Sequence, residues 1–292
     1  MVTLDQGGAG AARLRIHLPA PPLAPLVEYY WTERSGPGAP GDDRWRIVAD
    51  DAPHLIFSTA RTPSGLRSRL TIVGARRVFV DIDRSTRVVT VGARLRPGAL
   101  PALFGLPADG VTDHGIALAD FAPTEARTAM AQLEESPSLA AYRPLESALR
   151  ALAARGRPVD PRARWLGRLP TTCGNDLDLL ARQLGLSGRG LRAWSHPTLG
   201  LGLKRFFRIR RLHAVLRQRA SVSSWSRAAA LAGYADQAHC SRETRALLGE
   251  PPSAFRARRG GAVPFHSSAG GSSTLGLSDH QSAETRCHSP SS

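Results

Sequence analysis

The sequence predicts an α+β N-terminal domain, strand-rich and then helical, followed by an all-α domain with two helix-turn-helix units. Two observations predict this fold class. Up to Leu95, short segments rich in β-branched residues alternate with Pro- and Gly-rich loops, whereas helical periodicity begins near Ala99. A helix–turn–helix pattern then occurs twice near the C-terminal end, with its copies about 48 residues apart.

The first part of the chain is expected to form strands. Residues 1–13 are expected to be disordered, and the N-terminal regulatory or sensor domain is predicted to span residues 14–156. Segments rich in Val, Ile and Phe, separated by turn-forming Pro, Gly, Ser and Asp, predict strands. These strands are Arg13–Leu18, Trp45–Val48, His54–Ser58, Leu70–Val73, Arg77–Ile82 and Val88–Leu95. The short apolar segment Leu26–Trp31, after Pro25, can begin as a helix.

Helices are predicted from Ala99 onward. Apolar residues at helical spacing predict helices at Ala99–Phe104, Pro123–Leu133 and Ser138–Arg155. The Gly- and Pro-containing residues 156–159 then mark a domain boundary.

The second domain is predicted to span residues 160–259. Asp160 followed by Pro161 has the order expected of a helix N-cap and first helical residue, which predicts an opening helix at Arg162–Leu169. A long helix, Lys204–Arg219, is expected to link the two repeats, with six Arg and Lys204 interpreted as a solvated basic face. Residues 260–292, rich in Gly, Ser and His, are expected to be a disordered tail.

The repeated pattern covers Leu177–Gly200 and Trp225–Gly249. In each copy an Ala lies four residues before a Gly, a turn follows, and a second helix ends at another Gly. The equivalent pairs are Ala181 and Ala229, Gly185 and Gly233, and Gly200 and Gly249. Two helices joined by a short, Gly-containing turn form a helix-turn-helix, and Ser187 and Asp236 stand where each second helix needs a cap.

Charge is distributed unevenly along the chain. The formal net charge is +15 at pH 7, and residues 173–259 hold 16 basic against 5 acidic residues, whereas residues 1–172 hold 22 and 17. A basic domain beside a nearly balanced one is typical of proteins that bind a polyanion. A general Arg bias in the proteome could account for the total charge but not for this asymmetry.

Several other functional classes have no support in the sequence. No apolar run approaches the roughly 18 residues needed to span a bilayer, so no membrane partner is expected. Three cysteines without C-x-x-C spacing favour the reducing cytoplasm. The sequence contains no P-loop, nucleophile elbow or G-x-G-x-x-G, so no catalytic residue or cofactor is assigned. His17, His54 and His114 are scattered, and no metal site is expected.

Three segments carry a family resemblance: LARQLGLSGRGLR, the linking RFFRIRRLHAVL and, above all, GYADQAHCSRETRALLGEPPSAFR. Through them residues 160–258 resemble the DNA-binding domain of AraC/XylS-family transcriptional regulators. HLPAPPLAPLVEYYW and RLRPGALPALFGLPADGVTD look like the domain that precedes this module in one subgroup of the family. The resemblance implies double-stranded promoter or operator DNA as the partner. It also implies an N-terminal domain that senses a small-molecule effector, forms a homodimer, or does both.

Candidate DNA-binding residues lie at the start of each second helix, whose N-terminal half reaches base edges in a helix-turn-helix. In the first repeat, Arg189 and Arg192 are three residues apart and share a helix face. Arg can bind guanine O6 and N7 through two hydrogen bonds. The alternative interpretation is a solvated helix face.

The second repeat offers Gln237, His239, Ser241 and Arg242 at the corresponding positions. The resemblance implies base or phosphate contacts at Gln237, Ser241 and Arg242. Asp236 is expected to cap the helix, and His239 is expected to be structural or to face a phosphate.

The sequence departs from the family pattern at four positions. Ser195 replaces the usual aromatic of the first recognition helix, and Pro197 is expected to end or kink that helix near Ser195. Cys240 and Thr244 replace large apolar residues of the second helix, a change that commonly costs about 3–5 kcal/mol when nothing fills the space. A weakened DNA-binding domain is therefore one expectation.

Two alternatives to a transcription factor remain open. In one, the N-terminal domain is an enzyme, and the basic module merely targets nucleic acid. DNA-repair alkyl transferases of this kind need a reactive Cys, and residues 1–172 contain none. In the other, the protein binds nucleic acid without sequence preference, through phosphate contacts alone.

Overall fold

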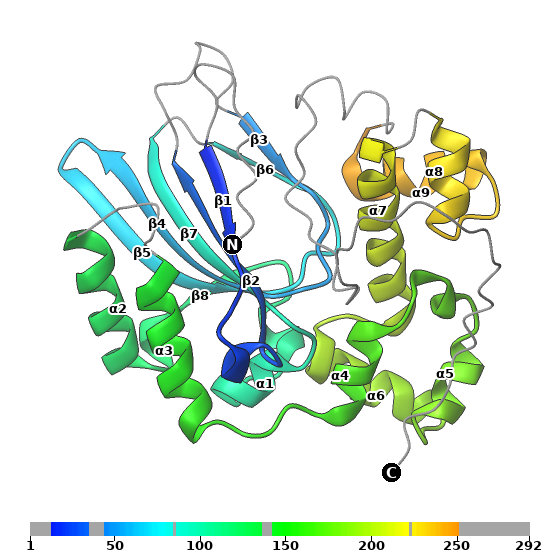
Figure 1. The fold of residues 1–292 in the computed structure, drawn as a ribbon, viewed down its shortest axis with the longest axis horizontal. Helices are drawn as coiled ribbons and strands as arrows, with labels where there is room; N and C mark the ends of the chain where they lie inside the picture. The colour runs from blue at the N-terminus through cyan, green and yellow to red at the C-terminus, as the bar shows by residue number, and fades with distance from the viewer. Residues whose placement is uncertain (1–12, 35–43, 84–85, 136–141, 222–223, 251–292) are drawn as a thin grey trace, which may run out of the picture.

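The computed structural model describes residues 13–34, 44–83, 86–135, 142–221 and 224–250 (Figure 1). The predicted disorder at residues 1–12 and 260–292 lies outside these residues. The described chain forms a strand-rich N-terminal part with helices, followed by a helical C-terminal part, and this confirms the predicted fold class.

Two antiparallel sheets form the N-terminal part. The larger has six strands in the order β1-β2-β7-β4-β5-β8, and the smaller consists of β3 and β6. The bounds are β1 Arg13–His17, β2 Val27–Arg34, β3 Arg44–Ile47, β4 His54–Thr62, β5 Gly65–Val73, β6 Val80–Asp83, β7 Arg87–Leu95 and β8 Gly115–Ala117. In β4, buried Leu55, Phe57 and Thr59 alternate with more exposed residues, because successive side chains of a strand point to opposite faces.

The structure differs from the sequence-based prediction at several strands. β4 extends to Thr62 and β5 begins at Gly65, so both are longer than predicted, and β6 begins at Val80 instead of Arg77. The Leu26–Trp31 segment does not begin a helix: β2 starts at Val27 and pairs with both β1 and β7. Its pairing on both sides satisfies the backbone of an apolar run that has no clear alternation. Arg13 belongs to β1 rather than to the disordered N-terminus, and the three-residue β8 was not predicted.

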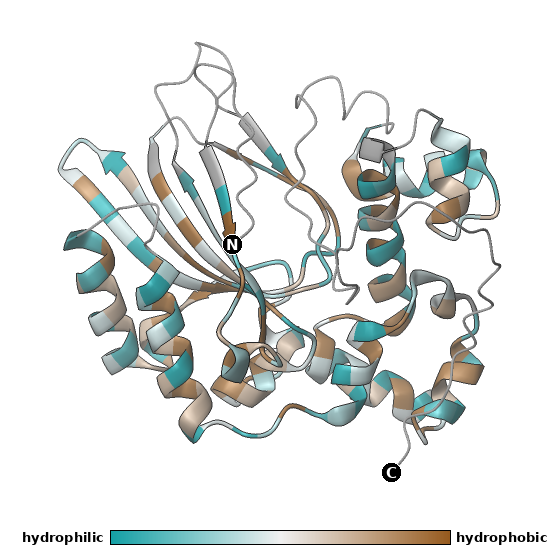
Figure 2. Ribbon diagram, viewed as in Figure 1, coloured by the Kyte–Doolittle hydropathy of each residue, from teal (hydrophilic) through white to brown (hydrophobic). Residues whose placement is uncertain are grey.

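Helices cover the larger sheet. α1 (Ala99–Phe104), α2 (Pro123–Glu135) and α3 (Tyr142–Arg155) follow β7 and the short 3-10 turns, and α2 and α3 lie side by side against the sheet (Figure 1). Ala126, Ala129, Leu145 and Leu149 share one core with the buried side chains of the strands. Brown and teal alternate along these helices in Figure 2, as expected of helices with one buried face.

Six helices form the C-terminal part that the structure describes up to Glu250. They are α4 Pro161–Arg168, α5 Leu177–Gln183, α6 Gly188–Leu199, α7 Leu203–Ser221, α8 Trp225–Leu231 and α9 Gln237–Leu248. α5 with α6 and α8 with α9 are the two helix-turn-helix units, and α7 links them. Phe206, Phe207 and Leu212 of α7 are fully buried at the centre of this part.

The second core is shared between the two parts of the chain. Val48, Ala49 and Ala75, which precede and follow strands of the N-terminal part, are buried in one cluster with the helices α4–α9. The domain division at residues 156–159 stays a prediction, because side chains from before and after these residues are buried in this one cluster. Among the described residues, no helix combines the length and apolar character needed to cross a membrane.

Candidate nucleic-acid interface

The first recognition helix, α6, begins and ends where the sequence predicts. Ser187 caps it by accepting a hydrogen bond from the Gly190 amide at 3.0 Å, and Gly200 ends it with a φ of 77°. Leu191 and Leu199 are buried, so the opposite face is turned to solvent. Arg189 and Arg192 lie exposed in the N-terminal half of this helix, where the prediction needs them.

Of the two effects predicted for Pro197, an end or a kink near Ser195, the end is wrong. The helix continues through Pro197 to Leu199. Pro197 lies in the last turn, where the missing amide deprives only one carbonyl of its partner. The Gly200 amide still closes that turn on His196 O at 2.8 Å.

The second recognition helix, α9, is built in the same way. Asp236 caps it by accepting from the His239 amide at 2.6 Å, and Gly249 ends it with a φ of 76°. Gln237 and Arg242 are exposed near its start, and Ser241 is half-buried. The Ser226 hydroxyl of α8 donates to Gln237 Oε1 at 2.6 Å and so restrains that carboxamide.

His239 has a packing role in the structure. Its half-buried ring stands edge-on to Tyr234, with ring centroids 5.5 Å apart, and its Nε2 lies 3.9 Å from the carboxylate of Glu243. Burial raises the pKa of the Tyr234 hydroxyl above its ordinary range. Tyr234 and Glu243 are thus neighbours of the His239 ring, and the expectation that His239 is structural or faces a phosphate stays a prediction.

Sequence reasoning missed the residue that joins α9 to α7. Glu243 accepts from Arg208 Nε at 2.6 Å and lies 3.8 Å from the guanidinium of Arg211. Arg210 donates to the carbonyl oxygens of Leu166 and Gly167 at 3.0 and 3.2 Å. The solvated basic face predicted for the linking helix is therefore wrong for these three arginines, which attach α7 to its neighbours.

Small side chains are buried at the two α9 positions for which the family resemblance implies a large apolar residue. Cys240 is 2 % and Thr244 0 % exposed, and Cys240 Sγ lies 3.8 Å from Thr244 Oγ1. Burial raises the pKa of the Cys240 thiol. Ser195 is 1 % exposed in α6, and its hydroxyl donates to Arg192 O at 3.3 Å. Each of these three side chains therefore places a polar atom in the core, and the one contact described for that atom is long and local.

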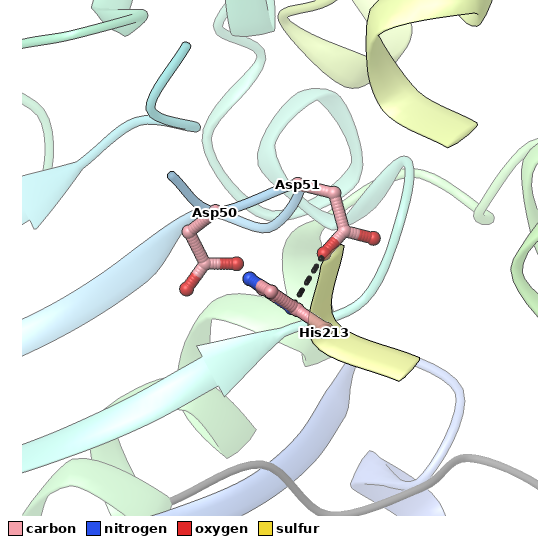
Figure 3. A group of neighbouring side chains, drawn as sticks. All are labelled: Asp50, Asp51 and His213. Atoms are coloured by element: carbon pink, nitrogen blue, oxygen red, sulfur yellow. Dashed lines mark ion pairs between the residues drawn. The ribbon is translucent and has the colours of Figure 1, made fainter. Parts of the chain in front are cut away.

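A buried ionic cluster lies where α7 meets the sheet-bearing N-terminal part, and no local sequence pattern predicted it. Asp50 and Asp51, between β3 and β4, face His213 of α7, as Figure 3 shows. Arg94 of β7 pairs with Asp50, with Asp51 at 2.8 Å and with Glu28 at 2.8 Å. The cluster therefore contains residues that are up to 185 positions apart in the sequence.

The pKa values in this cluster follow from burial and from the ion pairs. Burial by itself would raise the pKa of Asp50, but Arg94 and the hydrogen bond from His54 hold that pKa well below its ordinary value. Burial lowers the pKa of His213 despite the neighbouring Asp50 and Asp51. His213 Nε2 donates to Ala49 O at 2.7 Å, which suits a neutral ring.

Asp50, Asp51 and His213 have the chemistry of a cation site, since one ligand atom of each lies within 4.8 Å of the others. The guanidinium of Arg94 already supplies positive charge to both carboxylates. A metal ion would have to displace it and leave a cation buried at 7 % exposure. The geometry therefore favours an ion-pair network over a metal centre.

Two family models match the chain, one in each part. Residues 15–117 match a family described as a domain of unknown function (DUF6597), and residues 180–258 match a helix-turn-helix domain family. No curated protein matches the chain.

Solved structures with a similar course of the chain include ToxT from Vibrio cholerae O395, at 7% sequence identity and a TM-score of 0.40, covering 75% of this chain and 98% of that chain. A lysine-to-alanine variant of apo ToxT from Vibrio cholerae strain SCE256 is 8% identical, with a TM-score of 0.40, and covers 86% and 98%. At these values the likeness carries no conclusion about what this chain binds.

Proposed function

The chain carries an AraC-type helix-turn-helix domain at residues 180–258, and from this premise we propose that it is a sequence-specific transcriptional regulator. In this proposal α6 and α9 enter successive segments of the major groove of double-stranded promoter DNA. In this proposal the protein is not an enzyme. It acts in the bacterial cytoplasm, which holds the DNA.

One observation carries the proposal: the two helix-turn-helix units repeat each other in detail. Each second helix has a side-chain cap, at Ser187 and at Asp236, and each ends at a left-handed Gly. Exposed side chains suited to base edges lie in the N-terminal half of both helices. A single unit can arise as a structural helix pair, whereas two matched units with exposed reading faces suit a two-site DNA contact.

The exposed side chains suggest which contacts carry sequence information. Arg189, Arg192 and Arg242 are each able to bind guanine O6 and N7 through two hydrogen bonds. Gln237 is exposed, and because its Oε1 already accepts from Ser226, its amide hydrogens are the groups proposed to contact a base. Ser241, half-buried, is better placed for a phosphate oxygen than for a base.

The N-terminal part is proposed to regulate this binding, through a small-molecule effector, through dimerisation, or through both. Its core closes over the sheet and α1–α3 without involving the recognition helices. Its contacts with α7 offer a route by which a change in the N-terminal part could reach both reading heads, the recognition helices α6 and α9.

The test is selection of bound sequences from a random DNA pool with the full-length protein at about 0.15 M salt, because low salt inflates non-specific binding. The proposal expects an enriched motif with two parts about one helical turn apart, roughly 10–10.5 base pairs. Binding without any enriched motif would instead identify a non-specific nucleic-acid binder, and no binding would contradict the proposal.

A further inference from the structure

The two recognition helices end against the sheet-bearing part at equivalent positions. Gly200, at the end of α6, has its carbonyl oxygen 2.7 Å from the donating hydroxyl of Thr112. A Cβ on Gly200 would lie 2.7 Å from Thr112 Oγ1 and 3.0 Å from Ala108 O. The end of the first reading head therefore fits tightly against the 3-10 turn Ala108–Val111 and the residue after it.

Gly249, the equivalent residue at the end of α9, meets the other sheet. A Cβ on Gly249 would lie 2.4 Å from two ring carbons of Phe79. The Phe79 amide donates to Leu247 O at 3.2 Å, and Arg46 donates to Leu248 O at 3.0 Å while stacking on the Phe79 ring at 4.2 Å. The second reading head is thus held by side chain and backbone together.

The turn glycines of the two units make no such contact with the N-terminal part: a Cβ on Gly233 would meet only Thr172 of the C-terminal part, at 2.8 Å. Gly185, in the turn of the first unit, also has a positive φ, of 66°, yet a Cβ there would meet nothing within 4 Å. Between the two ends, α7 is held to the same N-terminal part by His213 Nε2, which donates to Ala49 O at 2.7 Å. The N-terminal part therefore contacts both recognition helices and the helix α7 that links them.

We propose that the sheet-bearing part is a brace that fixes the spacing of the two recognition helices, with Thr112 and Phe79 as its positioning residues. This inference rests on the proposed DNA-binding function. Because the brace contacts the C-terminal ends of α6 and α9, it leaves their N-terminal halves free to read bases. It acts on DNA only through the helices that it positions.

DNA geometry makes such a brace consequential. One added base pair moves the second half of a site by about 3.4 Å and turns it by roughly one-tenth of a helical turn. A rigid pair of recognition helices then loses the contacts of one half, whereas a loosely held pair can adjust. The brace therefore makes the protein selective for one spacing.

The experiment compares full-length wild type with a variant that carries Thr112→Val and Phe79→Ala. Affinity is measured for the selected site and for sites with one base pair inserted or deleted between its halves. The matched control carries Thr124→Val and Phe121→Ala, the same changes at exposed positions of the N-terminal part. For wild type and control, the altered spacing should lower affinity by about tenfold or more, as expected for the loss of one good base contact.

For the brace variant, the penalty for altered spacing should fall to about threefold or less, even if its affinity for the unaltered site also changes. A spacing penalty equal to that of wild type would overturn the brace. If the double variant loses its helical circular dichroism, Thr112→Val alone, which replaces the hydroxyl with a methyl group, is compared with Thr124→Val in the same series.

A second measurement does not depend on DNA. Spin labels are attached through noncanonical amino acids at positions 189 and 242, and the distance distribution between them is recorded in the full chain. The brace expects a narrow distribution in wild type and control and a clearly broader one in the brace variant. Equal widths would overturn the brace, and this holds even if random-pool selection finds no motif and the proposed function fails.

Discussion

His213, in the middle of the linking helix α7, donates its Nε2 hydrogen to the carbonyl oxygen of Ala49 at 2.7 Å, across 164 residues of sequence. A carbonyl oxygen can only accept, so the bond assigns the proton to Nε2 and leaves Nδ1 toward Asp51, at 3.7 Å from its carboxylate. The contact joins the helix that carries both reading heads to the part of the chain expected to regulate them.

Arg94→Met should destabilise the protein strongly. The substitution keeps an unbranched apolar stem but removes the guanidinium, which leaves Asp50, Asp51 and Glu28 without their shared cation. Removal of one partner from a buried ion pair costs about 3–5 kcal/mol. The midpoint of urea unfolding, followed by circular dichroism, measures the loss. The control is Arg77→Met, whose partner is Asp113 and whose side chain is 59% exposed; it should cost at most about 1 kcal/mol. Equal effects would contradict the importance of burial.

Stability should fall on mild acidification because of His213. Burial lowers the pKa of His213 in the fold, so the folded state favours the neutral ring. The stability gained from this preference is complete above the unfolded pKa of about 6.5 and is lost as the pH falls below it. His213→Gln retains an amide donor for Ala49 O but cannot titrate.

The measurement is the melting temperature of both proteins at about pH 7 and about pH 5. The other histidines are common to both proteins, so the difference isolates His213. Wild type should lose more of its melting temperature than His213→Gln. A larger loss in the variant would mean that Asp50 and Asp51 stabilise a charged His213 instead.

Thr244→Val should stabilise the protein by about 1 kcal/mol. The buried Thr244 hydroxyl has a sulfur partner 3.8 Å away, and a poorly satisfied buried hydroxyl costs about 1–3 kcal/mol. Val has the same shape and a similar helix propensity. Thr244→Leu serves as the comparison: it should cost stability where neighbouring side chains fill the space around this buried position, and gain stability where they leave it open. A destabilised Val variant would show that the hydroxyl interaction matters more than its geometry suggests.

Arg192→Ala and Arg242→Ala should each relax sequence preference at one or two base pairs. Both arginines are exposed on recognition helices, and a bidentate contact to a base contributes about 1–3 kcal/mol of discrimination. Binding to the selected and to a scrambled site across a salt series distinguishes base from phosphate contacts. Arg127→Ala, the removal of an exposed positive charge from α2, is the control and should change neither affinity. If Arg192→Ala weakens binding to both DNAs by the same factor and flattens the salt slope, Arg192 contacts a phosphate.

Gly249→Ala should cost more stability than Gly185→Ala. Both residues have a positive φ, which costs a residue with a Cβ about 1–2 kcal/mol. At Gly249 the new methyl group would also collide with the Phe79 ring, whereas at Gly185 it would meet nothing. Urea midpoints of the two variants measure the difference. Indistinguishable midpoints would show that the Phe79 ring moves aside freely.

The sequence by itself determined the local features of both helix-turn-helix units. The caps at Ser187 and Asp236 and the helix ends at Gly200 and Gly249 appear where they were predicted. Each depends on interactions within about four residues, such as a side chain that bonds a nearby amide, and so leaves a readable pattern. The Leu26–Trp31 segment, most of which forms β2, was misread, because a strand buried on both faces, as the adjacent Tyr29 and Tyr30 are, need not alternate.

Tertiary structure alone decided how the distant parts meet. Asp50, Arg94 and His213 are unremarkable in the sequence, since nothing near any of them indicates a partner. They become an ionic cluster only when the packing of two apolar cores brings β7, the β3–β4 connection and α7 together and excludes water. The same packing sets Thr112 against Gly200 and Phe79 against Gly249. Hydrophobic burial is non-directional and acts over the whole surface, so the contacts it creates between remote residues leave no local sequence pattern.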